Sequence, residues 1–183
     1  MRIIGIDPGL RHTGWGIVEF KNNKINYIGD GRISPSTSIP DGERLFFIKK
    51  QLLEIIVKYI PNQSAIEQIF VGFGAGSSLK LGMARGVSMS VLAESGLKIS
   101  EIPPKLVKKT ITGYGSASKQ QIKSMIENLI HVIPKNEDSA DALAIAISAH
   151  HIKNNNMTSN LHGANNSLDL AIAKALLKEK NKT

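Results

Sequence analysis

The stretch that decides the fold is RIIGID at residues 2–7, followed by PGLRHTG at 8–14 and WGIVEF at 15–20. The first run is almost continuously apolar, the second supplies turn residues, and the third returns to a strand-like pattern, so we expect a β-hairpin. The segment INYIGDGRI at 25–33 follows a turn at NNK and alternates well enough to add a third strand. The chain is therefore predicted to begin with an antiparallel meander.

Helices and further strands follow the meander. Across residues 42–59 apolar side chains recur every three or four positions, which predicts an amphipathic helix with Asp41 as its N-cap. SAIEQIF at 64–70 predicts a strand, and the glycine-rich VGFGAGSS at 71–78 predicts a loop. The other expected elements are a helix at 79–95, a strand at 97–102 and helices at 105–111, 119–131 and 137–153. Three strands followed by alternating helices and strands predict an α/β layer arrangement.

Composition divides the chain into a domain and a tail. With 183 residues, 42% of them hydrophobic, the chain is long enough for one domain with a substantial core, which we place at residues 1–153. NNNMTSNLHGANN at 154–166 is too polar to pack, and SLDLAIAKALLKEK at 167–180 has helical spacing. We expect residues 154–183 to be an asparagine-rich linker and a C-terminal helical tail. A tail that frays or docks weakly is the simpler reading, and a dedicated partner-binding helix is the alternative.

The composition also limits the function. The chain has no cysteine, which excludes a disulfide framework and a thiolate zinc site. We find no signal peptide and no apolar run long enough to cross a bilayer, so we expect a soluble cytoplasmic protein without a membrane partner. The formal net charge of +8 favours a polyanion such as nucleic acid, although general basicity explains the charge equally well.

Two acidic residues stand where a strand should be buried. Asp7 ends the isoleucine-rich first strand, and Glu67 lies within the apolar segment SAIEQIF. An ionised carboxylate without partners would cost several kcal/mol in such a place. We therefore expect positive charge beside each of them.

Two further acids open the segment EDSADALAIAISAHH at 137–151, which is apolar nearly all the way round when drawn as a helix. Asp138 and Asp141 lie one turn apart on the same side of this helix. Helix capping is the alternative explanation for Asp138, and it is weaker for Asp141, which lies further into the apolar run.

Carboxylates from two strands and one helix form an oxygen-rich donor set, which suits magnesium. Two such ions can activate water and stabilise the leaving oxygen when a phosphodiester is hydrolysed, and this is the reaction class that we infer. The alternative is that an arginine or backbone donors satisfy each acid separately.

Five blocks of sequence occur in an order that resembles a known family. They are GIDPGLRHTGWG at 5–16, IEQIF at 66–70, SSLKLGMARGV at 77–87, TGYGSASKQQI at 112–122 and DSADALAIAI at 138–147. From Met1 to about His151 the chain resembles the RuvC family of bacterial Holliday junction resolvases. The resemblance implies an RNase H-like α/β fold, with a five-stranded mixed sheet flanked by helices.

The resemblance also implies an activity. It is the resolution of four-way junction DNA by paired symmetrical nicks, in DNA recombination and repair, by a homodimer that works with the RuvA and RuvB branch-migration complex. A twofold protein suits this reaction because two related active sites can cut paired strands. The implied cofactor is Mg²⁺, with two ions per active site and Mn²⁺ as a substitute. The family's catalytic and metal-binding acids fall on Asp7, Glu67, Asp138 and Asp141.

Four more residues match DNA-binding positions of the family. Phe70 matches an aromatic that stacks on a base near the junction centre, and an ordinary core phenylalanine is the alternative. Lys108 and Lys119 match lysines near the active site, where they could bind phosphate or stabilise developing charge; solvated helix lysines are the alternative. Arg85 lies in the ARG block and is expected to support DNA or subunit contacts, or else the structure alone.

The loop VGFGAGSS departs from the family, which usually has an asparagine and an acid there. Its DNA contacts and the preferred cleavage sequence therefore remain open. The histidines His12, His150 and His151 are expected to have surface or helix-end roles and no part in catalysis.

Three other classes of protein are alternatives to this family. An actin-like ATPase or sugar kinase begins with a similar strand and hairpin. That fold needs two such domains, however, and this chain supplies one. A YqgF-type RNase H-like protein also opens with a strand ending in an aspartate, whereas the blocks at 77–87 and 138–147 favour RuvC. A DNA-binding module without catalysis is expected to lack at least one of the four catalytic acids, and all four are present in this sequence.

Overall fold

Five strands form one mixed sheet in the computed structural model, which describes residues 1–22, 24–69 and 75–152. They are β1 (Arg2–Asp7), β2 (Thr13–Lys21), β3 (Lys24–Ile33), β4 (Gln63–Glu67) and β5 (Ile99–Ile102). Their order in the sheet is β3-β2-β1-β4-β5. The first three strands pair antiparallel, and β4 and β5 continue the sheet parallel to β1. The predicted meander and the predicted mixed sheet are confirmed.

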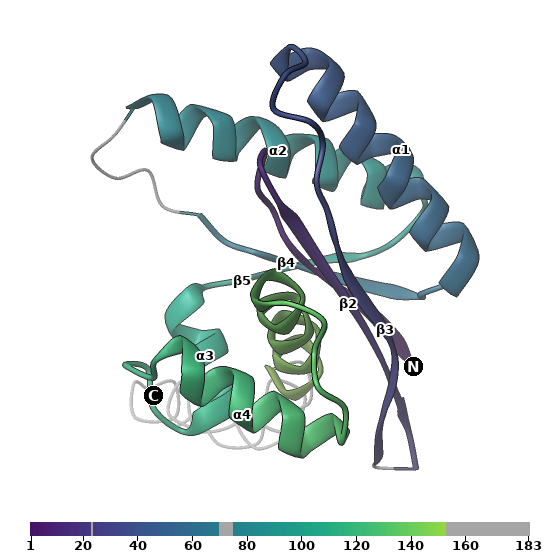
Figure 1. The fold of residues 1–183 in the computed structure, drawn as a ribbon. Coiled ribbons are helices and arrows are strands. Elements are labelled where there is room, and N and C mark those ends of the chain that lie inside the picture. The colour runs from purple at the N-terminus through teal and green to yellow at the C-terminus, as the bar shows by residue number, and fades with distance from the viewer. Residues whose placement is uncertain (23, 70–74, 153–183) are drawn as a thin grey trace, which may run out of the picture. The chain divides into compact units, whose positions relative to one another are not determined.

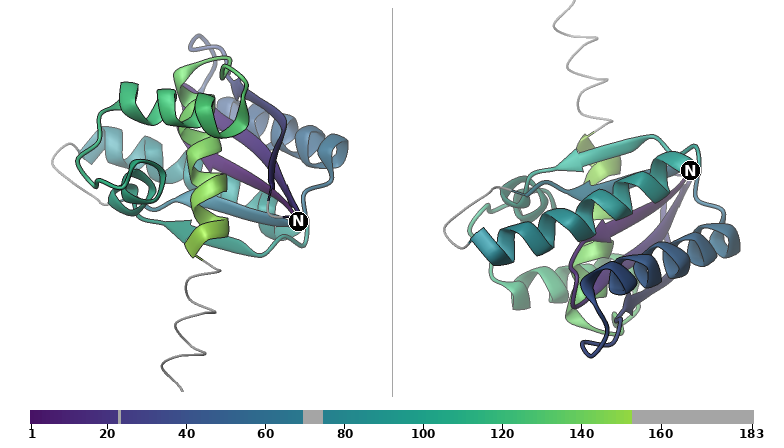
Figure 2. Two further views of the ribbon diagram at one scale, coloured as in Figure 1. Left: turned by 90° about the horizontal axis from the view of Figure 1, so that it is seen from below. Right: turned by 90° about the horizontal axis from the view of Figure 1, so that it is seen from above.

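Helices cover both faces of this sheet. They are α1 (Asp41–Tyr59), α2 (Ala75–Glu94), α3 (Pro104–Thr112), α4 (Lys119–Ile130) and a last helix whose described part is residues 137–152. In the compact unit Met1–Ala149, α1 and α2 lie on one face, while α3, α4 and the last helix lie on the other (Figure 1, Figure 2). Among the helices in these described ranges, none is long and apolar enough to cross a membrane.

Several predicted element boundaries are wrong; β5, for example, begins at Ile99 instead of Leu97. Asp41 is the first residue of α1, and Pro40 takes the N-cap position without a side-chain hydrogen bond. β4 ends at Glu67 instead of Phe70 because its neighbour β5 ends at Ile102, the residue paired with Glu67. α2 begins at residue 75, inside the predicted loop, so the helix includes Gly76 and the two serines that follow it. Phe70 and the predicted tail at 154–183 lie outside the described residues.

The alternation of side chains along β1 and β4 separates the apolar core from the acids. Ile4, Ile6 and Ile66 are buried in the core with residues of α1 and α2. Asp7 and Glu67 directly follow Ile6 and Ile66, so their side chains point to the opposite face. That face is the one covered by the last helix.

The last helix approaches the sheet closely because glycines lie beneath it. A Cβ placed on Gly5 of β1 would come within 2.1 Å of the carbonyl oxygen of Ala142, and one on Gly14 of β2 within 2.1 Å of the carbonyl oxygen of Asp138. Any side chain at these two positions would push the helix away from the sheet. The glycines therefore bring the start of the helix, with its acids, down to the end of β1.

Candidate active site

Asp7 and Glu67 end two neighbouring parallel strands. β1 and β4 pair with Ile6 opposite Ile66, so the next residue on each strand is one of these acids. Both side chains are half-buried. The parallel pairing explains why two acids distant in the sequence reach the same edge of the sheet.

The other two acids lie in the first two turns of the last helix, whose cap is formed by different residues. The backbone N–H of Ser139 donates to Asn136 Oδ1 at 2.9 Å, and the backbone N–H of Asn136 donates to Ser139 Oγ at 3.2 Å. This reciprocal pair satisfies donors at the helix start. Asp138 is therefore not needed as the cap, and its carboxylate and that of Asp141 are left to other partners.

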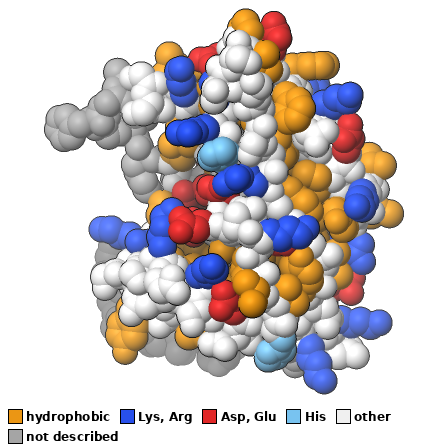
Figure 3. Space-filling view, viewed as in Figure 1, with side chains coloured by type: hydrophobic (Ala, Val, Ile, Leu, Met, Phe, Trp, Pro, Cys, Tyr) orange, Lys and Arg blue, Asp and Glu red, His pale blue; other side chains and the backbone are white. Residues whose placement is uncertain are grey.

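Two hollows meet at Asp7. The first, which we call the acid pocket, has a volume of about 270 Å³, and its lining includes Asp7, Glu67, Asp141, Lys108 and Lys119. The second, the basic hollow, has a volume of about 600 Å³, and its lining includes Asp7, Asp138, Arg11, Arg44 and Lys80. On the face drawn in Figure 3, acidic side chains gather together and basic side chains lie close around them. Such a surface attracts phosphate while keeping carboxylates at its centre.

The carboxylates of the acid pocket oppose one another's ionisation. Burial, followed by the charges of Glu67, Asp141 and Asp138, raises the pKa of Asp7 from its usual 3.8 to about 8, against a lowering effect of Lys119. Burial and then Asp141 raise the pKa of Glu67, and burial raises the pKa of Asp141. The acids therefore form one electrostatic cluster that additional positive charge would stabilise.

Two basic residues already supply part of that charge. Lys119 Nζ lies 3.5 Å from Asp141 Oδ2, and Asp141 is the largest cause of the raised pKa of Lys119. Arg32 Nη1 donates to Asp138 Oδ2 at 3.2 Å. Within the described ranges, no three Asp, Glu, His or Cys side chains lie close enough together to hold one metal ion. The structure thus brings Asp7, Glu67 and Asp141 into one pocket and leaves Asp138 facing Arg32.

Arg32 is a residue of the site that the sequence did not predict. It lies on β3, where its Cα is paired with Gly14 of β2. Gly14 is in turn paired with Asp7 of β1. Only the order of the three strands reveals that Arg32 can reach the acids.

The predicted DNA-binding residues lie in different places. Lys108 and Lys119 line the acid pocket together. Arg85 of α2 is largely buried, because its Nε donates to the carbonyl oxygen of Glu67 at 3.1 Å and its Nη2 pairs with Glu101 of β5. Arg85 therefore holds the backbone at the end of β4. Phe70 cannot be placed, since it lies outside the described residues.

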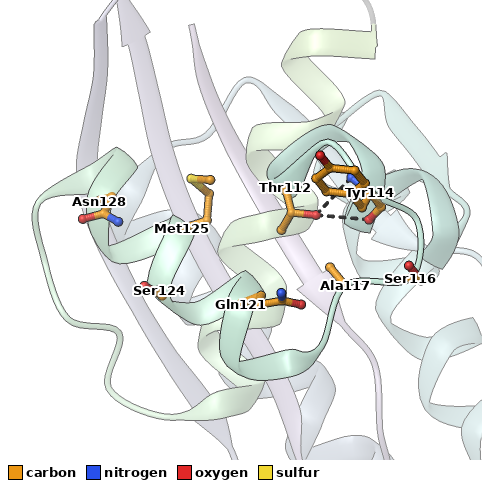
Figure 4. Close-up of a pocket in the computed structure, with 8 residues that line it drawn as sticks. All are labelled: Thr112, Tyr114, Ser116, Ala117, Gln121, Ser124, Met125 and Asn128. Carbon is orange, nitrogen blue, oxygen red and sulfur yellow. Dashed lines mark hydrogen bonds between the residues drawn. The ribbon is translucent and has the colours of Figure 1, made fainter.

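A third hollow lies apart from the acids, between α4 and the loop that follows α3. Its volume is about 390 Å³, and it is lined by mostly polar side chains together with Ala117 and Met125, drawn in Figure 4. Within it, Thr112 Oγ1 donates to the carbonyl oxygen of Tyr114 at 3.1 Å. None of the predicted site residues lines this hollow.

A mixed sheet of this order, with carboxylates at the ends of two central strands and on a helix that crosses them, defines an RNase H-like nuclease. The family model for crossover junction endodeoxyribonuclease RuvC matches residues 3–150. The chain belongs to this RuvC family. Family membership confirms the predicted fold and the predicted class of enzyme, and it decides against the ATPase and YqgF-type alternatives.

Individual relatives agree with the family model. The crossover junction endodeoxyribonuclease RuvC of Rhodopseudomonas palustris (strain BisA53) is 47% identical over 153 residues, which cover 82% of this chain and 88% of the relative. The RuvC of Azorhizobium caulinodans is 46% identical, with 82% and 90% covered.

Solved structures show the same fold. Thermus thermophilus RuvC in complex with a Holliday junction substrate has a TM-score of 0.76 and 30% identity, and the match covers 81% of this chain and 92% of that one. The yeast mitochondrial Holliday junction resolvase Ydc2 shares the fold at 14% identity, with a TM-score of 0.57 and coverage of 80% and 77%.

Proposed function

We propose that this chain resolves Holliday junctions by paired symmetrical nicks, through Mg²⁺-dependent hydrolysis of phosphodiester bonds, in DNA recombination and repair. Family membership supports the reaction, and the Thermus thermophilus relative bound to a Holliday junction supports the substrate. The observation that carries the metal-dependent part is the cluster of mutually repelling acids around Asp7, whose pKa is raised to about 8 by burial and then by Glu67, Asp141 and Asp138. Such a cluster suits a divalent cation and a phosphate that approaches it.

The chemistry of the four acids fits magnesium. Asp7, Glu67, Asp138 and Asp141 offer only carboxylate oxygens, the donors that Mg²⁺ prefers. Asp138 and Asp141 pair with Arg32 and Lys119, and their side chains are 29% and 28% exposed, so a cation can reach their oxygens by replacing those partners. When bound, two ions would activate the attacking water and stabilise the leaving oxygen, and Mn²⁺ would substitute for Mg²⁺.

The lysines of the acid pocket are proposed to bind the scissile phosphate. Lys108 and Lys119 line the same hollow as Asp7, Glu67 and Asp141. A phosphate placed among carboxylates needs nearby cations, and fixed ammonium groups also stabilise charge that develops during hydrolysis. Phe70 is proposed to stack on an unpaired base near the junction centre. For Arg85, the contacts with Glu67 and Glu101 favour a structural role over DNA contact.

We further propose a homodimer that acts in the cytoplasm with the RuvA and RuvB complex. A Holliday junction offers two equivalent strands, so a twofold pair of active sites can cut both and leave ligatable nicks. Residues 154–183 are proposed to form the linker and helical tail outside the nuclease domain 1–153.

The test is an incubation of the purified protein with a synthetic four-way junction, with and without Mg²⁺. The wild type should nick two opposing strands only when Mg²⁺ is present. Asp7→Asn should still bind the junction and should not cut it, since it keeps the shape of the side chain and loses its charge. Glu94→Gln is the matched control, because Glu94 pairs with Lys49 on the other face of the sheet and should cut normally. Equal cutting by Asp7→Asn would contradict its assigned role, and ATP turnover without nicking would support the kinase-like alternative.

A further inference from the structure

Asp30 of β3 is a fully buried carboxylate with a complete set of donors. Its side chain has an exposed fraction of 0%. The Tyr27 hydroxyl donates to Oδ1 at 2.7 Å, whereas the Ser139 hydroxyl and the Lys135 backbone N–H donate to Oδ2 at 2.6 and 2.8 Å. A buried carboxylate is stable only when such donors satisfy it.

The two oxygens of Asp30 have different partners. Oδ1 accepts its hydrogen bond from Tyr27, which lies on the same strand, and Lys135 Nζ lies 4.0 Å from it as an ionic partner. Oδ2 is bound by residues 135 and 139, at the start of the last helix, and Lys135 Nζ adds a bond to the Asp30 carbonyl oxygen at 3.1 Å. The hydrogen bond to Oδ1 therefore stays within β3, whereas both hydrogen bonds to Oδ2 attach the start of the last helix to β3.

The hydrogen bond from Ser139 to Asp30 is made between Asp138 and Asp141 in the sequence of the helix. Ser139 directly follows Asp138 and precedes Asp141 by two residues. Two positions further along β3 from Asp30, Arg32 pairs with Asp138 itself. Residues two apart on a strand share a face, so the same face of β3 contacts the first turn of the helix at two points.

Other residues determine how closely the last helix packs on the sheet. In the sheet, Asp30 is paired with Gly16 and Arg32 with Gly14. A Cβ on Gly16 would come within 2.7 Å of the Leu143 backbone nitrogen. The glycines of β2 therefore determine the distance between the last helix and the sheet. The hydrogen bonds to Asp30 determine the position of the first turn of this helix along β3.

We propose that Asp30 is a positioning residue that holds Asp138 and Asp141 in place for the divalent cation, an inference that rests on the proposed function of these acids. Asp30 itself contacts neither the cation nor DNA. Residues that orient metal ligands through hydrogen bonds typically change metal affinity or activity by about 10- to 100-fold when they are replaced.

Three substitutions distinguish a positioning role of Asp30 from an effect on protein stability alone. Asp30→Val replaces the carboxylate by an apolar side chain of similar size and leaves the donors of Tyr27, Lys135 and Ser139 without this acceptor. Asp30→Asn can direct its oxygen to the helix donors and its amide to the Tyr27 oxygen, so it preserves the attachment. Tyr27→Phe removes a hydrogen bond from the same carboxylate on the strand side only.

The variants are compared by Mn²⁺ calorimetry, by the Mg²⁺ dependence of junction cleavage, by junction binding without divalent cations and by the free energy of unfolding. We expect Asp30→Val to weaken Mn²⁺ binding and to raise the half-saturating Mg²⁺ concentration by about tenfold or more, with junction binding unchanged. Tyr27→Phe should lower stability and leave both metal measurements within about threefold of the wild type, and Asp30→Asn should restore them to that range.

A folded Asp30→Val protein with wild-type Mn²⁺ affinity and Mg²⁺ dependence would overturn the inference, as would equal effects of Tyr27→Phe and Asp30→Val on the metal measurements. If Asp30→Val does not fold, Ser139→Ala removes one of the two bonds to Oδ2 together with the cap bond from Asn136, and Asn136→Ala is the control that removes cap bonds alone. Failure of the wild type to cut junctions overturns the proposed function, whereas normal cutting with unaffected variants overturns only the role of Asp30.

Discussion

Gly14 lies directly against the main chain of Asp138, where a Cβ on the glycine would come within 2.1 Å of the Asp138 carbonyl oxygen. In the sheet, Gly14 is also the partner of Asp7. The missing side chain at one position of β2 therefore sets the separation between an acid of β1 and an acid of the last helix. The geometry of the site depends on main-chain packing as well as on the acids themselves.

Gly14→Ala should displace the first turn of the last helix. We expect a loss of about 1–3 kcal/mol in the free energy of unfolding, measured by chemical denaturation. The reason is that the added methyl group has no room between β2 and the main chain of Asp138. Junction cleavage should fall by more than about tenfold, since a small misplacement of catalytic groups has large kinetic effects. Gly42→Ala in α1 is the control, because a Cβ there meets nothing within 4 Å. Wild-type cleavage by Gly14→Ala would show that the contact does not control the site.

Asp7→Asn should change how stability depends on pH when divalent cations are removed by chelation. The pKa of Asp7 rises from 3.8 to about 8 on folding, through burial and then the charges of Glu67, Asp141 and Asp138, so the folded chain holds this proton more tightly than the unfolded chain. The resulting contribution of Asp7 to the free energy of unfolding is complete below about pH 4 and is lost as the pH rises to about 8. At pH 8 the variant should be the more stable protein, by on the order of 1–3 kcal/mol.

Thermal unfolding of both proteins from pH 4 to pH 8 measures this difference. The two curves should converge at low pH and separate as the pH rises. Added Mg²⁺ should raise the melting temperature of the wild type more than that of Asp7→Asn, because a ligand stabilises the state that binds it. Parallel curves across the whole range would show that Asp7 ionises normally.

Lys119→Met should reduce cleavage more than binding. Lys119 Nζ lies 3.5 Å from Asp141 Oδ2 and shares the acid pocket with Lys108. Loss of a fixed positive charge beside the reacting phosphate should lower the cleavage rate at saturating Mg²⁺ by about 10²- to 10³-fold. Lys50→Met, at an exposed position of α1, is the matched control for loss of one positive charge. Similar small losses in both variants would indicate that Lys119 acts only through net charge.

Arg85→Ala should act through the backbone of β4. Arg85 Nε donates to the carbonyl oxygen of Glu67, so its removal should lower both the melting temperature and the cleavage rate. The salt dependence of junction binding should stay the same, since a residue that contacts no phosphate releases no counterion. A shallower salt dependence in the variant would instead support the DNA contact first expected for Arg85.

The sequence is most informative where burial conflicts with charge. Asp7 and Glu67 stand out because each belongs to an apolar strand, and the structure places both on the face opposite the buried Ile6 and Ile66. The meander and the order of helices are also predictable, since their signals are local periodicities. Lys108 and Lys119 depend on the family match, because lysines on helices carry no local sign of function.

Asp30 and Arg32 could not be predicted in the same way. Their partners Ser139 and Asp138 are 109 and 106 residues distant along the chain. The pairing depends on which strand lies at which position in the sheet and on how deeply the last helix packs. In the sequence both residues read as polar positions of an ordinary outer strand.

The central claim is that Asp7, Glu67, Asp138 and Asp141 together hold divalent cations. An anomalous difference map from crystals soaked in Mn²⁺ tests it most directly. We predict density between Asp7, Glu67 and Asp141, with the Asp138 carboxylate turned away from Arg32 and toward the ion. An empty acid pocket, with Asp138 still on Arg32 and Asp141 still on Lys119, would contradict the claim.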